Sequence, residues 1–187
     1  MRCHDSTYGA TEFNPDAKIS QRFRPFTARR RTVPTLYGSR TVAGALSETL
    51  FHAVPVDGPD RKVRLSRLDA WQISHLAPMR ALQLADLTDP NLEAIEMARE
   101  ELIESPAIEY PRTAEWAQAL FHCPLQPDGL VWNARQGRKD LALVLFQRGR
   151  VRRQDLEIVK PPVPMAVGRG AELAYAAAED MEITLVG

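Results

Sequence analysis

Cysteine is scarce in this sequence: Cys3 and Cys123 are the only two among 187 residues. Two cysteines so far apart do not make the disulfide framework of a small secreted domain, and neither belongs to a Cys-x-x-Cys pair. His4 and His122 neighbour them, but no set of four ligands has the spacing of a zinc site. We therefore expect two reduced thiols and no metal.

An excess of charge of either sign is also missing, because 24 basic side chains balance 24 acidic ones. Proteins that bind nucleic acid by neutralising its phosphates usually carry a basic excess. The balance therefore argues against direct binding of nucleic acid, while it leaves room for a local basic pocket.

Long hydrophobic runs are absent as well, and none approaches the roughly 18 residues that a membrane-spanning helix needs. The first residues include Arg2, His4 and Asp5, and they lack the apolar core of a signal peptide. A cytoplasmic protein without membrane contact is therefore expected. With 44% hydrophobic and 26% charged residues, the composition is typical of a soluble globular domain.

Short apolar runs between turn signals predict several strands. Val63 and Leu65 alternate with polar neighbours, and the unbroken apolar run from Leu141 to Phe146 indicates a central strand. Further strands are expected at residues 33–37, 73–76, 80–87, 130–132 and 183–186. The three prolines between positions 161 and 164 are expected to interrupt regular structure.

Three helices are expected in the second half of the chain. Asp89 as a cap and Pro90 at the first position open one that runs to Leu102, Thr113 caps another, and the alanine-rich residues 171–178 form the third. Strand and helix patterns alternate irregularly. This favours an α+β fold with a mixed or antiparallel sheet over a regular doubly wound one.

An earlier helix carries a candidate functional carboxylate. The hydroxyl of Thr41 can cap a helix that begins at Val42 and continues with helical spacing of apolar residues to position 53. Gly44 and Glu48 fall on a different side of this helix. Because Gly44 leaves space one turn before Glu48, a ligand or another backbone can approach there. His52, four residues after Glu48, can pair with it, although a structural role fits it better.

Arg22, Tyr37 and Glu48 lie close together in the sequence, on a loop, a strand end and this helix. The trio suits a dinucleotide. Its pyrophosphate needs a cation, and its ribosyl carbon needs a nearby carboxylate when the glycosidic bond breaks.

Four stretches together carry a family resemblance: residues 8–15 (YGATEFNP), 22–26 (RFRPF), 36–52 (LYGSRTVAGALSETLFH) and 128–136 (DGLVWNARQ). In their residues and their order along the chain they resemble the RES-domain proteins, named after an arginine, a glutamate and a serine. That family comprises toxins of bacterial toxin–antitoxin pairs, in which the partner is an antitoxin with an Xre-type helix-turn-helix.

The resemblance implies a single RES-like domain over residues 1–187, with a core at about 8–150 and a C-terminal extension at 151–187. The implied fold is similar to ADP-ribosyltransferases, with a split mixed β-sheet and flanking helices around a cleft for NAD. The implied activity is destruction of NAD as substrate, with inorganic phosphate as co-substrate or with water. The implied partner is the antitoxin. The chain is expected to form either a homodimer or a hetero-oligomer with this antitoxin.

Carried over residue by residue, the resemblance places Arg22, Tyr37 and Glu48 on the family's arginine, tyrosine and glutamate. The family serine falls on Ala134, so this chain lacks that hydroxyl. Three explanations stay open. The first is that a serine was deliberately replaced by alanine to reduce the toxicity of the protein. The second is that Asn133 or Arg135 takes the place of the serine, or that the register of the comparison is off by one. The third is that the protein is a relative with weak catalytic activity.

The residue types suit the chemistry that the resemblance implies. Glu48 would stabilise positive charge that develops on the ribosyl carbon. Arg22, assisted by Arg24 or Arg135, would bind the pyrophosphate, and Tyr37 would stack on the nicotinamide. Phosphate as acceptor needs another cation, for which residues 29–31 or Arg138 and Lys139 are available; Asn133 is a further candidate for contact with the dinucleotide.

Two other functions compete with NAD phosphorolysis or hydrolysis. One is transfer of ADP-ribose to a protein, as in a few relatives. The other is binding without catalysis, in which an impaired relative only engages its antitoxin. Ala134 is the feature that favours the second alternative.

Overall fold

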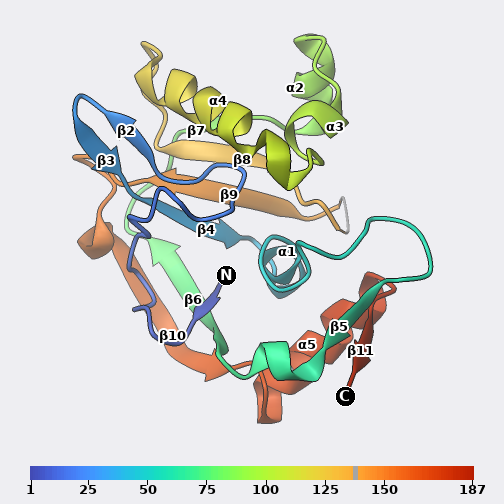
Figure 1. Cartoon of the computed structure of the whole chain (residues 1–187). Coiled ribbons are helices and arrows are strands. Elements are labelled where there is room, and N and C mark those ends of the chain that lie inside the picture. The colour runs from blue at the N-terminus through green and yellow to red at the C-terminus, as the bar shows by residue number, and fades with distance from the viewer. Residues whose placement is uncertain (137–138) are drawn as a thin grey trace.

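The computed structural model describes residues 1–136 and 139–187 and shows an α+β fold built on two main sheets (Figure 1). The larger sheet has the strand order β4-β9-β8-β7, with pairs β4–β9 and β9–β8 antiparallel and β8–β7 parallel. Its strands are β4 (Thr35–Ser39), β9 (Leu141–Phe146), β8 (Gly129–Asn133) and β7 (Leu84–Asp86). The predicted fold class and the interior position of β9 are both confirmed.

The smaller sheet is antiparallel, with β6 (Trp71–Pro78) between β1 (Arg2–Asp5) and β10 (Leu156–Pro164). The expectation that the prolines near 161 interrupt regular structure is wrong, because β10 continues through them. Its pairing with β6 shifts register between Ile158 and Val163. A proline lacks the N–H that a ladder needs, so an edge strand with an irregular register accommodates it.

Two short pairs complete the strands. The antiparallel hairpin of β2 (Phe26–Ala28) and β3 (Arg31–Val33) turns at Arg29 and Arg30, and the parallel pair joins β5 (Lys62–Arg64) to β11 (Thr184–Val186). The strand expected over Val63 to Leu65 is therefore shorter, since a 3₁₀ helix begins at Leu65.

The helices are α1 (Val42–Ser47), α2 (Asp89–Ala94), α3 (Arg99–Leu102), α4 (Tyr110–His122) and α5 (Gly168–Asp180). Short 3₁₀ helices lie at Leu65–Leu68, Ala107–Glu109 and Arg153–Asp155.

Three predictions for the helices after α1 need correction. Asp89 is not the cap of α2 but its first residue, and the N-cap residue is Thr88. The single helix expected from Asp89 to Leu102 is split into α2 and α3, because Glu96 adopts a left-handed backbone with φ of 55°. Thr113 does not cap a helix: it lies inside α4, and its buried hydroxyl donates to the carbonyl of Arg22 at 2.6 Å.

Helix α1 lies near the centre of the molecule, with the larger sheet and α4 on one side and α5 on the other (Figure 1). Thr41 caps it as predicted, accepting the N–H of Gly44 at 3.0 Å. The helix ends at Ser47, earlier than the spacing predicts, and turns follow it to residue 53.

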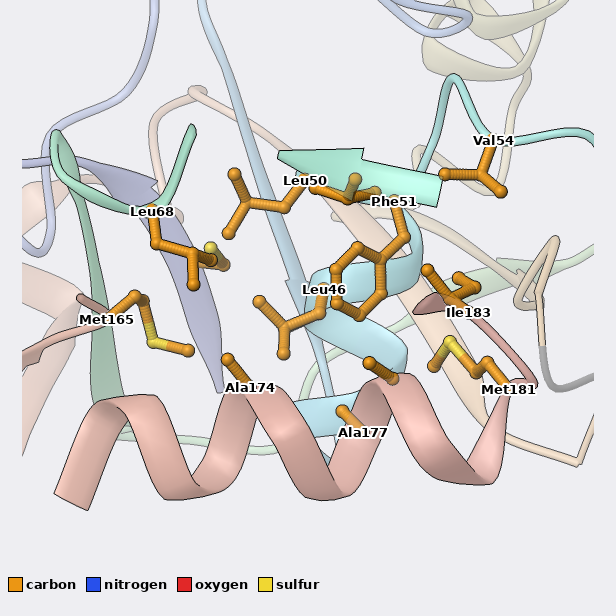
Figure 2. Close-up of a cluster of buried hydrophobic side chains, with 14 of the residues drawn as sticks. Leu46, Leu50, Phe51, Val54, Leu68, Met165, Ala174, Ala177, Met181 and Ile183 are labelled. Atoms are coloured by element: carbon orange, nitrogen blue, oxygen red, sulfur yellow. The ribbon is translucent and has the colours of Figure 1, made fainter. Parts of the chain in front are cut away.

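The apolar side of the α1 segment is packed against α5 (Figure 2). Leu46, Leu50 and Phe51 have no exposed surface and share a cluster with Ala174 and Ala177 of α5. Burying each of the three large side chains contributes about 1.5–3 kcal/mol. This packing fixes the height and rotation of α1, and therefore the position of Glu48 directly after it.

We expected from the sequence that Gly44 leaves space for a ligand or for another part of the backbone. The structure shows no free space for a ligand there. A Cβ on Gly44 would collide with the Oγ of Ser39 and approach Asp140, so another part of the chain already fills that space. The absence of a side chain thus lets α1 pack closely onto the end of β4 and the 140 turn.

Candidate functional site

A buried ion pair joins Arg22 to Glu48. The Nη1 of Arg22 lies 3.2 Å from the Oε2 of Glu48, and the residues are 1% and 5% exposed. The other carboxylate oxygen, Oε1, accepts the backbone N–H of Arg135 at 2.9 Å. Burying a carboxylate is costly unless both oxygens find donors. The loop before β2, the end of α1 and the turn after β8 therefore meet at this carboxylate.

The loop that carries Arg22 is held from both sides. The N–H of Phe23 donates to the hydroxyl of Tyr37 at 2.8 Å, and Thr113 binds the carbonyl of Arg22. The fully buried ring of Phe23 packs edge-on against Trp132, with centroids 5.0 Å apart. These contacts aim the guanidinium of Arg22 at Glu48.

Tyr37 lies on β4 beside this pair and is half-buried. Burial raises the pKa of its phenol, with a smaller opposing effect of Arg22. The hydroxyl is therefore neutral, and one of its acceptor positions is already taken by the N–H of Phe23. What remains for a ligand is mainly the ring.

His52 extends the polar network. Its Nε2 lies 3.4 Å from the Nη2 of Arg22 and 3.3 Å from the hydroxyl of Tyr110, while its carbonyl accepts from the side chain of Arg135 at 3.2 Å. Burial, and then the charge of Arg22, lower the pKa of His52 from 6.5 to about 4. A guanidinium can only donate, so we infer that the neutral ring keeps Nε2 unprotonated as an acceptor.

These groups line a cleft made of two adjoining cavities. The first, of about 200 Å³, is lined by Arg22, Tyr37, Glu48 and His52 among others. The second, of about 240 Å³, is more apolar and shares four lining residues with the first: Gln21, Tyr37, Thr49 and Trp71. Their combined size falls within the range of about 300–1,000 Å³ that is usual for small-molecule sites.

Two guanidinium nitrogens at this site lack a partner within the described part of the chain. They are the buried Nε atoms of Arg22 and Arg135. Buried donors are usually paired. Arg22 lines the first cavity, so its Nε is a candidate donor to a bound ligand.

The other residues predicted for the site lie elsewhere or are built into the fold. Arg24 does not line the cleft. The amide oxygen of Asn133 accepts the N–H of Asp89 at 3.0 Å, which ties β8 to the start of α2. Arg135 contacts the site through its backbone N–H and through His52. The functional roles given to these residues remain predictions.

Ala134, on the position of the family serine, is fully buried in the apolar cluster beneath α4. Its N–H donates to the carbonyl of Asp140 and its own carbonyl accepts from Arg99. It does not line the cleft.

The cations considered for an acceptor phosphate are not at the cleft either. Arg29 and Arg31 line a different cavity, and Lys139 pairs with Asp180 at 2.9 Å. Arg138 lies outside the described residues.

Sequence reasoning did not single out several residues that line the cleft, among them a cation and an aromatic residue of the first cavity. Arg67, in the 3₁₀ helix after β5, lines the first cavity, and its exposed side chain has no hydrogen bond or ion pair within the described residues. Trp71, at the start of β6, lines both cavities. Neither lies near the motifs in sequence, so only the tertiary structure reveals them.

Comparison with known protein families adds the identity of the fold family. The family model of the RES domain matches residues 1–167, so the chain belongs to the RES domain family. This membership is consistent with an NAD-related domain associated with toxin–antitoxin pairs. No curated protein and no solved structure matches the chain.

The described residues show neither a metal-binding cluster nor a membrane-spanning helix. They contain no group of three or more side chains arranged to hold a metal ion. No helix among residues 1–136 and 139–187 is both long and apolar enough to cross a membrane.

The low pKa of His52 predicts a pH dependence of stability. The folded protein binds a proton at His52 only near pH 4, whereas the unfolded chain binds it near 6.5. The unfolded state therefore holds more protons between these values, and stability falls as pH is lowered through that window. We expect the free energy of unfolding of the wild type to drop about 2 kcal/mol more than that of His52→Gln between pH 6.5 and 4. Urea titrations across this range measure it, and parallel pH profiles for the two proteins would contradict it.

Proposed function

We propose that this protein is an NAD-consuming toxin of a toxin–antitoxin pair, which cleaves the bond between nicotinamide and ribose with phosphate as acceptor. Membership of the RES domain family supports the class of reaction. The observation that carries the proposal is the convergence of Arg22, Tyr37 and Glu48 on one cleft. On this proposal the fold is of the ADP-ribosyltransferase type, and the partner is an Xre-type antitoxin.

The proposed reaction breaks the bond between the ribosyl carbon and the nicotinamide nitrogen. The electron pair of that bond leaves with nicotinamide, which becomes neutral, and a phosphate oxygen then bonds to the ribosyl carbon. The products are nicotinamide and ADP-ribose phosphate; water in place of phosphate gives ADP-ribose. Positive charge on the sugar peaks in the transition state, so a fixed carboxylate nearby stabilises that state more than the substrate.

The assignment of this role to Glu48 is supported by the fixed position of its carboxylate before substrate arrives. One oxygen is bound by Arg22 and the other by the N–H of Arg135. A preorganised group needs no reorientation during the reaction, which is why such electrostatic contributions are large. The ring of Tyr37, at the junction of the two cavities, offers a surface on which a base can stack.

The anionic parts of the reactants need cations that are not consumed by the ion pair. The Nε of Arg22 is unpaired, and Arg67 at the edge of the same cavity is exposed and without a partner in the described residues. A guanidinium fork matches phosphate oxygens well. We therefore assign Arg67 to the pyrophosphate of NAD or to the acceptor phosphate.

A second candidate function is binding without catalysis, and Ala134 is the observation that favours it. If the family hydroxyl is required, a chain with alanine there would engage the antitoxin but leave NAD intact.

Transfer of ADP-ribose to a protein differs from phosphorolysis in the acceptor. Added phosphate accelerates nicotinamide release by a phosphorylase, whereas an added acceptor protein accelerates it for a transferase.

Replacing Glu48 tests the carboxylate. We expect Glu48→Gln to slow nicotinamide release from NAD by at least about 100-fold, because it removes the charge that stabilises the transition state. The change also leaves the buried Arg22 unpaired, which costs about 3–5 kcal/mol of stability, so circular dichroism must show that the variant is folded at the assay temperature. Glu93→Gln, at an exposed glutamate of α2, is the control and should retain full activity. A folded Glu48→Gln protein with normal turnover would exclude the mechanism.

Replacing Arg67 tests the free cation. Arg67→Gln should raise the KM for NAD or for phosphate about tenfold with little change in kcat, as expected when a contact made equally in ground and transition states is lost. The matched control is Arg64→Gln, an exposed arginine of the same segment that does not line the cleft. Equal effects of the two substitutions on KM would show that Arg67 acts only through the general charge of the surface.

Restoring serine tests whether the alanine limits the enzyme. Because Ala134 is enclosed by apolar side chains and does not line the cleft, we expect Ala134→Ser to leave NAD turnover within about threefold and to lower the free energy of unfolding by about 1 kcal/mol. The assay is nicotinamide release by both proteins under the same conditions. A rise of tenfold or more would show that the hydroxyl completes the site, and no turnover by either protein would favour the binding function.

A further inference from the structure

A cavity separate from the cleft lies among the β2–β3 hairpin, the end of α4 and residues 148–150. In Figure 1 this hairpin lies at the end of β4 that is opposite α1. The volume of the cavity is about 730 Å³, and its walls come from the hairpin, the end of α4, the turn at Gln126 and residues 148–150. None of these lining residues also lines the cleft. We call this cavity the arginine pocket.

Four guanidinium groups line the arginine pocket, from Arg29, Arg31, Arg148 and Arg150. No acidic side chain is among its described lining residues. The four arginines come from two segments more than a hundred positions apart in the sequence, so their convergence is a product of the fold.

Two of these arginines are held in place by the fold. The guanidinium of Arg148 lies 4.2 Å from the centre of the Phe121 ring and donates to the carbonyl of Pro127 at 2.8 Å. Arg150 donates to Asp128 at 2.9 Å and to the carbonyl of Gln126 at 2.6 Å. Fixed cations of this kind lose little entropy when they bind an anion.

The other two arginines are exposed, and neither side chain of Arg29 or Arg31 has a hydrogen bond or ion pair within the described residues. The nearest compensating charge is that of Asp128, which is fully buried and already shared between Arg150 and Arg80. Positive charge therefore exceeds negative charge around the pocket. Burial lowers the pKa of Arg148, and the charge of Arg150 adds to this effect.

We propose that the arginine pocket binds a small ligand with two or more clustered phosphates, such as inorganic pyrophosphate or the phosphate chain of a nucleoside triphosphate. Guanidinium groups from several directions match the many oxygens of such a ligand. The zero net charge of the chain and the confinement of the arginines to one cavity disfavour a nucleic acid, which requires an extended basic surface. This site is independent of the proposed reaction at the cleft.

The test is isothermal titration calorimetry of the full chain with pyrophosphate and, separately, with ATP. We expect saturable binding of pyrophosphate that the double variant Arg29→Gln/Arg31→Gln weakens at least about tenfold, because two charge-assisted contacts are lost. Arg30→Gln is the matched control: Arg30 is exposed on the same turn but does not line the pocket, so its loss should change affinity less than about twofold.

A further variant keeps all four arginines. Gly149 lines the pocket and has open space around it, so Gly149→Glu places a carboxylate there without a steric clash. It should also weaken pyrophosphate at least about tenfold, through repulsion. ATP binding tighter than pyrophosphate would identify a nucleotide as the ligand, and equal affinities would identify the phosphates alone; both support the site. The proposal is overturned if pyrophosphate does not bind, if the double variant and Gly149→Glu bind it normally, or if Arg30→Gln weakens it as much as the double variant.

Discussion

The buried contact between Arg22 and Glu48 is the interaction on which the candidate site depends. An isolated carboxylate or guanidinium is very costly in a protein interior, so each of these side chains requires the other. The requirement is structural as well as electrostatic. It fixes the loop before β2 onto the end of α1, and the N–H of Arg135 adds the turn after β8 to the same point. Three segments distant in sequence are thereby joined at one carboxylate.

The apolar half of the molecule makes this polar contact possible. Helix α1 has only six residues, too few to be stable alone, and its position comes from the cluster that it shares with α5. Residues 156–164 complete the smaller sheet, and α5 covers the apolar side of α1. The C-terminal part of the chain therefore supports the site without contributing a side chain to the cleft.

The sequence predicted correctly those features of the fold that depend on neighbouring residues alone. The cap at Thr41 and the central strand at 141–146 depend on nearby residues and on apolar sequence, and both are confirmed. The failures have tertiary causes. Thr113 resembles a cap, but its hydroxyl is used by the carbonyl of Arg22, and the prolines of β10 are tolerated because that strand lies at a sheet edge. Arg22, Tyr37 and Glu48, which the motifs named, line one cavity in the structure, and their functional roles stay predictions. Arg67 lines the same cavity from a 3₁₀ helix that no sequence motif marks.

The distribution of arginines separates structural from ligand-binding cations. Both terminal nitrogens of Arg22 are engaged, one with Glu48 and one with His52, and Arg135 binds Glu48 through its backbone N–H and the carbonyl of His52 through its Nη1. Their main role is therefore structural, and contact with a bound anion is a secondary role. Arg67 is committed to nothing in the described residues, so its whole guanidinium is available. A substrate with several phosphate oxygens needs both kinds, since the fixed cations define where charge is stabilised and the free one adapts to the bound anion.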